Sequence, residues 1–290
     1  MVCSKPFVKD GKAFGCGQCL SCRINRQRVW AHRMMLEASM YEDNAFVTLT
    51  YDDQHLPEGG SLVPRHTQLY FKRLRKAGCR FRYYCVGEYG ETTQRPHYHL
   101  ALFGHPTCTR GLTRPNRSGY CCDNCTLLQR VWDYGAVYCG TITPQSASYI
   151  CGYVTKKMTH ESDPRLHGRH PEFARMSLRP GIGAGFMDEV ASTILSHDSL
   201  RLDDVPMSLR HGPSEKPLGR YLRRRLRERI GRDPGTPQVV LEKLEEELRP
   251  VREAAFNASQ SFASHVVQKN LGKIIRREQL HRIRKKGRRI

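Results

Sequence analysis

The sequence has no long run of apolar residues and comparatively few acidic residues. No stretch is apolar over the length needed to cross a bilayer, so neither a membrane-spanning helix nor a membrane partner is expected. The N-terminus carries Lys5, Lys9 and Lys12 but not the apolar core of a secretion signal. We therefore expect a protein that works in a cytoplasm.

The sequence also lacks the Gly-x4-Gly-Lys-Ser/Thr loop that holds the phosphates of a nucleoside triphosphate. The glycines of residues 181–185 have no lysine after them. We interpret this stretch as a loop approached by a ligand or as a simple bend. The chain is thus not expected to hydrolyse ATP itself.

Positive charge is abundant. The 290 residues include 48 Lys and Arg against 28 Asp and Glu, a formal net charge of +20, and the surplus is greatest toward the C-terminus. Such a charge favours a polyanionic partner, above all nucleic acid, over the alternative of a merely soluble basic protein. The length suits one large domain with extensions, or two domains.

Twelve cysteines accompany this charge. Without a secretion signal, thiols or metal ligands are favoured over a disulfide framework. Cys-x2-Cys spacing lets thiolates converge on one tetrahedral ion, which predicts a structural Zn²⁺ site at Cys3, Cys16, Cys19 and Cys22. An iron–sulfur cluster and free thiols are the alternatives. A second zinc site could use Cys108, Cys125 and either Cys121 or Cys122, with no evident fourth ligand.

Hydrophobic periodicity predicts an alternation of strands and helices. Arg23, Arg26 and Arg28 begin an amphipathic basic helix that could meet phosphates, and Arg223, Arg224 and Arg225 lie in another. We expect residues 276–290 to be a mobile cationic tail. Helices are expected at 23–41, 67–77, 127–132, 144–157, 221–230 and 239–255, and strands at 45–53, 81–89, 96–103 and 137–142.

The strand at 96–103 holds the most informative pattern, Pro-His-Tyr-His-Leu. Alternate side chains of a strand share a face, so His97 and His99 can bind one metal ion while Tyr98 packs on the other side. The turn-rich residues 90–95 predict a hairpin that brings Glu88 beside them. Two imidazoles and a carboxylate would then form a three-ligand site that leaves positions open for phosphate and water.

A second pattern lies in the helix expected from Pro144. Tyr149 and Tyr153 are four residues apart and so share one helix face, with Lys156 and Lys157 one turn further on. A tyrosine hydroxyl becomes a useful nucleophile when a metal makes phosphorus electrophilic and a lysine offsets the developing charge. Taken alone, the two tyrosines would more often be a packed aromatic stripe.

Together these patterns resemble a known superfamily. The order Phe46-Val-Thr-Leu-Thr-Tyr-Asp-Asp53, then Pro96-His-Tyr-His-Leu100, then Tyr149-x3-Tyr153-x2-Lys156 is similar to the three motifs of HUH rolling-circle replication initiators. The likeness is greatest to initiators of microviruses, especially the gokushovirus branch. The N-terminal cysteines and residues 177–186 also resemble that branch, and the likeness covers about residues 1–190.

The resemblance implies an α+β fold, in which helices flank a central antiparallel sheet of about five strands and a basic helical region follows. It implies that His97, His99 and Glu88 bind Mg²⁺ or Mn²⁺, and that Tyr149 and Tyr153 attack origin DNA with help from Lys156. A 5′-phosphotyrosine link and a free 3′-hydroxyl would result. The partners would be single-stranded DNA, viral replicative-form origin DNA, and the helicase and DNA polymerase of the bacterial host, in its cytoplasm.

We expect three parts: a cysteine-rich segment with a basic helix at 1–40, an HUH nuclease domain at 41–205, and a basic region, helical or partly disordered, at 206–290. Other members of the superfamily, such as a plasmid initiator, relaxase or transposase, would share the chemistry. A non-catalytic zinc-containing DNA-binding protein would explain the charge and the cysteines, but would leave the histidine and tyrosine patterns without a role.

Overall fold

The computed structural model describes residues 2–110, 121–153, 160–197 and 203–286. The chain forms two compact units, one made of Trp30–Val190 and the other of Met1–Val29 together with Ala191–Ile290. These boundaries differ from those expected from the sequence, whose three-part division concerns function and stays a prediction. Among the described residues, no helix combines the length and apolar character needed to cross a membrane.

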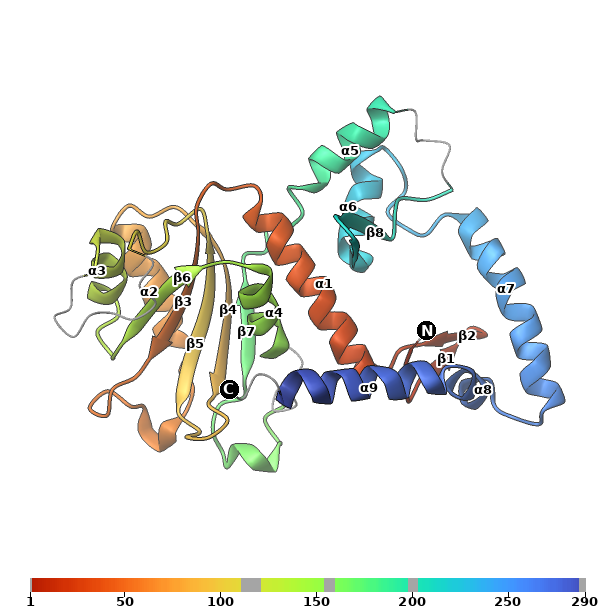
Figure 1. The fold of residues 1–290 in the computed structure, drawn as a ribbon, viewed down its shortest axis with the longest axis horizontal. Coiled ribbons are helices and arrows are strands. Elements are labelled where there is room, and N and C mark those ends of the chain that lie inside the picture. The colour runs from red at the N-terminus through yellow and green to blue at the C-terminus, as the bar shows by residue number, and fades with distance from the viewer. Residues whose placement is uncertain (1, 111–120, 154–159, 198–202, 287–290) are drawn as a thin grey trace. The chain divides into compact units, whose positions relative to one another are not determined.

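The unit Trp30–Val190 is built on a five-stranded sheet with the order β6-β3-β5-β4-β7, in which every neighbouring pair is antiparallel (Figure 1). This confirms the α+β fold. The histidine strand β5 is the central strand. The strands are β3 (Asn44–Thr50), β4 (Arg82–Tyr89), β5 (Pro96–Phe103), β6 (Val137–Thr141) and β7 (Phe173–Met176).

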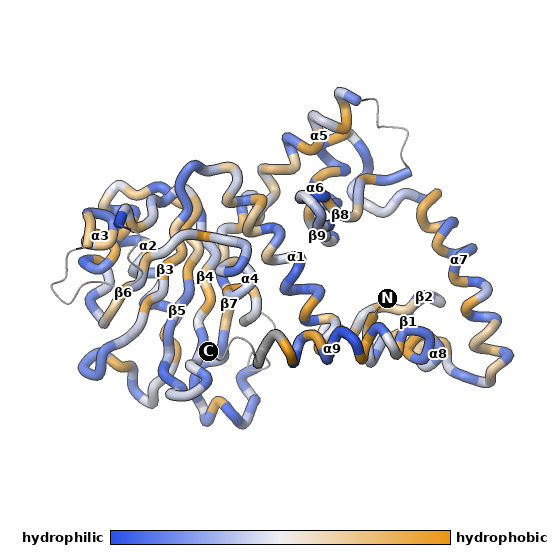
Figure 2. The backbone as a smooth tube through the Cα atoms, in the orientation of Figure 1, coloured by the Kyte–Doolittle hydropathy of each residue, from blue (hydrophilic) through white to orange (hydrophobic). Residues whose placement is uncertain are grey.

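Helices cover both faces of this sheet, and each face has its own hydrophobic core. Helices α2 (Pro64–Lys76) and α3 (Asp123–Arg130) pack on one face, and α1 (Leu20–Ala38) and α4 (Pro144–Tyr153) on the other. The strands running between them are largely hydrophobic (Figure 2). This pattern suits strands buried on both sides.

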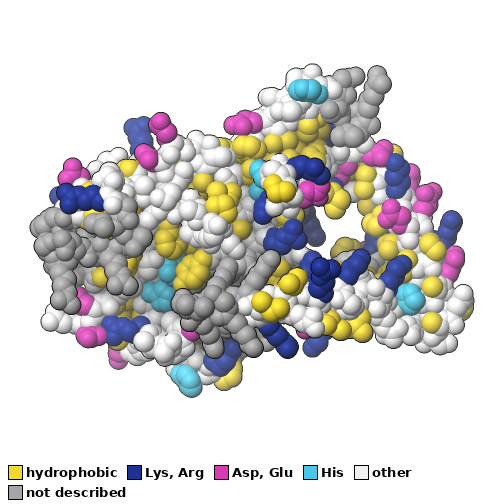
Figure 3. Space-filling model, viewed as in Figure 1, with side chains coloured by type: hydrophobic (Ala, Val, Ile, Leu, Met, Phe, Trp, Pro, Cys, Tyr) yellow, Lys and Arg dark blue, Asp and Glu magenta, His cyan; other side chains and the backbone are white. Residues whose placement is uncertain are grey.

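The two-residue period of β5 determines which side chains face which helices. Tyr98, Leu100 and Leu102 belong to the core beneath α2 and α3, whereas Ala101 and Phe103 belong to the core beneath α1 and α4. His97 and His99 therefore lie on the α1 and α4 face. Histidine side chains are visible at the surface over β5 (Figure 3).

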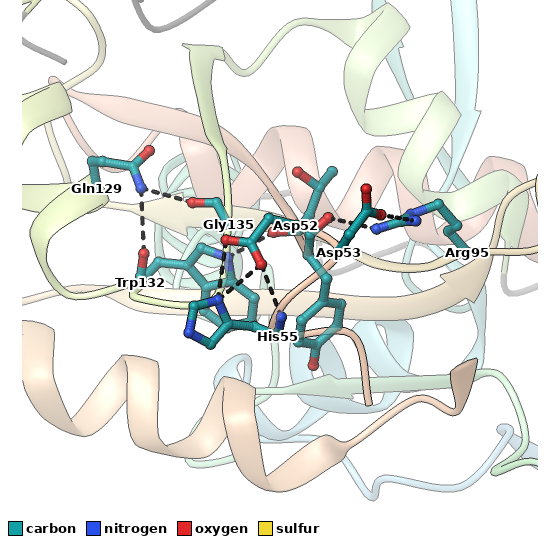
Figure 4. A network of polar contacts seen from close by, with 9 residues as sticks. Asp52, Asp53, His55, Arg95, Gln129, Trp132 and Gly135 are labelled. Carbon is teal, nitrogen blue, oxygen red and sulfur yellow. Dashed lines mark hydrogen bonds and ion pairs between the residues drawn. The ribbon is translucent and has the colours of Figure 1, made fainter. Parts of the chain in front are cut away.

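The end of β3 is held by a polar network (Figure 4). Trp132 Nε1 donates a hydrogen bond to the Thr50 carbonyl at 2.9 Å, and Gln129 Nε2 donates to the Gly135 carbonyl at 2.7 Å. A Cβ atom at Gly135 would lie 2.4 Å from the Thr50 oxygen, so only glycine allows this close approach of the two backbones. Arg95 pairs with Asp53 at 2.7 Å.

The glycine-containing segment 181–186 is a buried structural loop and not a surface for a ligand. Its Ile182 carbonyl accepts a hydrogen bond from Arg33 Nε at 2.9 Å, and the Gly183 N–H donates to Glu37 at 2.6 Å. Glu37 is itself almost fully buried and forms an ion pair with Arg82 of β4. One carboxylate thus joins α1, the sheet and the loop.

We expect Glu37→Ala to lower the free energy of unfolding by about 3 kcal/mol, because it leaves a mostly buried guanidinium without its partner. Chemical denaturation with fixed protein concentration measures the change. Asp133→Ala is the control, since it removes an exposed partner of Arg73 and should cost less than about 1 kcal/mol. Equal losses in the two variants would contradict the structural role given to Glu37.

The other unit contains two small hairpins and most of the remaining helices. The hairpins are β1 (Phe7–Lys9) with β2 (Lys12–Phe14), and β8 (Ser208–His211) with β9 (Ser214–Pro217). Residues expected to be a mobile tail instead form most of a helix, because apolar residues recur among the charges up to Ile283. The helices are α5 (Met187–Ser196), α6 (Gly219–Arg229), α7 (Gln238–Asn257), α8 (Phe262–Lys269) and α9 (Leu271–Lys286), of which α5 begins in the first unit.

Candidate functional site

The structure brings Glu88, His97 and His99 together as the hairpin pattern predicts. Glu88 lies directly opposite His97 in the β4–β5 ladder. Its Oε1 atom is 2.6 Å from His97 Nε2 and 3.1 Å from His99 Nε2. All three ligand atoms lie within 4.8 Å of one another, which is close enough for one ion to contact all three.

The outer ring nitrogens indicate how the two imidazoles are used. His97 Nδ1 lies 3.2 Å from the Arg95 carbonyl oxygen, which can only accept a hydrogen bond, so Nδ1 carries the proton. In the neutral ring, Nε2 then presents a lone pair to the Glu88 carboxylate. Two acceptors at 2.6 Å repel each other unless a cation, either a proton or a metal ion, lies between them. The donor set of two nitrogens and one carboxylate oxygen suits a divalent metal.

Burial strengthens the case for a cation. The side chain of Glu88 is 2% exposed and that of His99 is 6% exposed. A buried carboxylate is costly unless positive charge compensates it. His97 is 18% exposed, so the site opens toward solvent on the His97 side. A phosphate could therefore approach from there.

Tyr149 lies beside this group. Helix α4 holds its ring 5.2 Å from that of His99 in an edge-on arrangement, and the side chain is 41% exposed. The partial exposure leaves it accessible to a substrate. Tyr153 is the last residue of α4, but its side chain lies outside the described residues, as do Lys156 and Lys157.

Two further residues of the site, both on β3, were missed by the sequence analysis. Thr48 lies directly opposite His99, and its hydroxyl is 2.9 Å from His99 Nδ1. The ring of Phe46 stacks on His99 at 5.7 Å. Both fix the orientation of the imidazole. Their signal was the strand pattern of residues 45–50, which gives no register against the histidine strand.

Because Thr48 orients His99, we expect Thr48→Val to weaken Mn²⁺ binding by about 10- to 100-fold, the usual cost of losing a hydrogen bond to a metal-bound imidazole. Isothermal titration of the purified full chain with Mn²⁺ measures this effect. Thr48→Ser keeps the hydroxyl and should bind like the wild type. Wild-type affinity in Thr48→Val would show that the hydroxyl is dispensable.

The N-terminal cysteines also converge, in the other unit. The sulfurs of Cys3, Cys16, Cys19 and Cys22 lie within 4.8 Å of one another. Burial raises the pKa of the Cys19 thiol, but hydrogen bonds, first from the Ser4 and Cys22 N–H groups, outweigh it and lower the pKa to about 6. Burial and the adjacent thiols raise the pKa of Cys22 to about 12. A bound cation would relieve this crowding.

The arginines expected to bind DNA differ in their surroundings. Arg26 and Arg28 are exposed on α1, and Arg23 is half-buried. On α6, Arg223 pairs with Asp204, whereas Arg224 and Arg225 both pair with Glu228. The α6 arginines therefore have intramolecular partners that a phosphate would have to displace.

Comparison with known proteins agrees with this arrangement. Residues 44–158 match the family model of the replication-associated protein ORF2. Replication-associated protein ORF2 of Spiroplasma virus 4 is 32% identical over 275 residues, which are 90% of this chain and 83% of the relative. No solved structure matches the chain.

Two shorter matches are to other phages. Replication-associated protein VP4 of Bdellovibrio phage phiMH2K is 34% identical over 168 residues, or 55% of this chain. The match spans about half of that relative, 53% of its length. Replication-associated protein ORF4 of Chlamydia phage 1 is 30% identical over 151 residues, 49% of this chain and 38% of the relative.

Proposed function

This chain belongs to the replication-associated protein family of microviruses, and we propose that it initiates rolling-circle replication by cutting and rejoining single-stranded origin DNA. One observation carries the proposal. A half-exposed tyrosine, Tyr149, lies against a buried Glu88–His97–His99 group on the same face of the sheet. Packing alone would not require a carboxylate and two imidazoles at this position.

The Glu88, His97 and His99 side chains would hold Mg²⁺ or Mn²⁺, because their nitrogen and oxygen donors fit such an ion and their contacts require a cation. When bound, the ion would polarise the scissile phosphate. Thr48 and the Arg95 carbonyl would keep both imidazoles in the Nδ1-protonated form. The site would thus be ready for the metal before DNA arrives.

In the proposed reaction the hydroxyl oxygen of Tyr149 attacks phosphorus. A bond forms from that oxygen to phosphorus, and the bond from phosphorus to the 3′ oxygen breaks. The tyrosine gives up its proton, and the departing 3′ oxygen takes one up. Lys156 would neutralise charge on the phosphate, with the other basic residues, including Lys157, holding the strand.

The exchange of one phosphodiester for another needs no ATP. Host polymerase would extend the free 3′-hydroxyl while a host helicase opens the duplex, all in the bacterial cytoplasm. Tyr153 would then cut the regenerated origin, and ligation would release circular viral DNA. In this scheme residues 41–205 form the nuclease, 206–290 form a basic accessory region, and the Cys3–Cys22 group holds a structural Zn²⁺.

The test uses the full chain, Mn²⁺ and a set of oligonucleotides that tile the phage genome. We expect one oligonucleotide to become covalently attached, with the protein on its 3′-labelled fragment and a free 3′-hydroxyl on its 5′-labelled fragment. Peptide mass spectrometry should place the nucleotide on Tyr149 or Tyr153. Absence of cleavage across the whole set, or attachment to any other residue, would overturn the proposal.

A further inference from the structure

A second group of four cysteines lies in the Trp30–Val190 unit, apart from the proposed nuclease residues. Cys108 follows the histidine strand β5, Cys121 and Cys122 immediately precede α3, and Cys125 lies in the first turn of that helix. Their four sulfurs all lie within 4.8 Å of one another. The segment after β5 and the start of α3 therefore meet at one point.

The spacing of these sulfurs matches a single tetrahedral ion. Four thiolates at about 2.3 Å from one Zn²⁺ are separated by about 3.8 Å from each other. The sulfurs of Cys108 and Cys121 are 3.4 Å apart, far longer than a disulfide bond, and all four cysteines are free thiols. A cluster of several iron atoms would hold the thiolates further apart, since each would bind a different iron.

The surroundings also distinguish this group from ordinary buried cysteines, which behave as small apolar side chains. Cys85 and Cys151 are of that kind, each fully buried in the core of one sheet face. In the four-cysteine group, by contrast, Cys122 and Cys125 are half-exposed and still turn their sulfurs inward. The N–H groups of Thr109 and Cys125 donate hydrogen bonds to the Cys122 sulfur, as they would to a metal-bound thiolate.

We propose that Cys108, Cys121, Cys122 and Cys125 bind a second structural Zn²⁺. The sequence pattern left the fourth ligand open, and the structure supplies it because both members of the Cys121–Cys122 pair contribute. The site is closed by four protein ligands, which is typical of structural zinc and leaves no position for a substrate.

This ion would support the proposed nuclease site from the opposite face of the sheet. It ties the end of β5 to α3, and the C-terminal end of α3 leads directly to Gln129 and Trp132. These two residues hold the end of β3 through the Thr50 and Gly135 carbonyls. The same strand carries Thr48, the hydrogen-bond partner of His99. The ion thus stabilises a scaffold without contacting DNA.

Native mass spectrometry and elemental analysis of the full chain, purified without chelator, provide the test. We expect Cys125→Ser to contain one zinc equivalent fewer than the wild type. Cys79→Ser is the matched control, because Cys79 is a half-exposed cysteine outside both groups, and it should keep the wild-type content. Unchanged zinc in Cys125→Ser, or bound iron in place of zinc in the wild type, would overturn the assignment.

A second measurement on the wild type does not depend on how the variant folds. Iodoacetamide labelling followed by peptide mapping should leave Cys122 and Cys125 unmodified until a chelator removes the ion, after which both react. Cys85 and Cys151 should stay unmodified throughout, because the core alone protects them. Labelling of Cys122 and Cys125 before chelation would contradict a metal site. Neither readout involves DNA, so a failure here is distinct from a failure of the proposed nuclease.

Discussion

Replacing Tyr149 and Tyr153 together with phenylalanine should abolish the covalent protein–DNA adduct. Phenylalanine keeps the ring and its contact with His99 but removes the only atom that can bond to phosphorus. The expected result is therefore complete loss of adduct, with little change in folding or in charge-driven DNA binding. Denaturing gels with 3′-labelled origin DNA measure the adduct, and filter binding measures affinity.

The single variants show how the two tyrosines share the work. Tyr149→Phe should lose cleavage of the origin if Tyr149 attacks first, while Tyr153→Phe should still form the first adduct. Tyr83→Phe is the matched control, since Tyr83 packs against Phe71 on the other face of the sheet. Adduct formation by the double variant would refute a tyrosine nucleophile at this site.

Replacing His99 with alanine should slow adduct formation by about a thousandfold. A metal that polarises a phosphoryl oxygen contributes several kcal/mol to the transition state, and about 4 kcal/mol corresponds to a factor of a thousand. His99 is the more buried of the two imidazoles, and Glu88, Thr48 and Phe46 all contact it. Single-turnover rates at saturating Mn²⁺ give the comparison.

Three controls accompany His99→Ala. Chelation of the wild type should reproduce its slow rate, and added Mn²⁺ should restore the wild type but not the variant. His160→Ala removes an exposed imidazole whose partner is Ser162 and should react at the wild-type rate. DNA affinity should be nearly unchanged in both histidine variants. A wild-type rate in His99→Ala would mean that the imidazole plays no part in the reaction.

The sequence predicted the convergence of Glu88 and His97 because the cause is local. Residues 90–95 form a short turn, closed by hydrogen bonds between Gly90 and Arg95, and the register of the hairpin follows from it. The two-residue period of the strand then places His99 on the same face. Turn chemistry and alternation were therefore enough for three residues of the site.

Features that depend on distant parts of the chain were not predictable in the same way. Strand β7 has only four residues and pairs with β4 across more than eighty positions of sequence, so no local pattern indicated it. Thr48 joins the site through the register of β3 against β5, which a single sequence does not specify. The convergence of Cys108 with the α3 cysteines likewise depends on tertiary packing.

Charge patterns were a weaker guide than hydrophobic patterns. The run Arg223-Arg224-Arg225 has the composition of a phosphate-binding surface, yet all three side chains pair with Asp204 or Glu228. Composition reports how much charge a segment carries, and the fold decides which acidic groups lie near it. For the same reason, the cationic residues after Leu271 form a helix where a mobile tail was expected.

The chain contains only two tryptophans, and the sheet separates them. Trp132 is fully buried in the core shared with α2 and α3, whereas Trp30 packs into the core beneath α1 and α4, with the Arg33 guanidinium 4.0 Å from its ring centre. Each indole is therefore a built-in fluorescent reporter for one layer. Comparing the emission of single-tryptophan variants during unfolding would reveal whether the two layers melt in one transition or in succession.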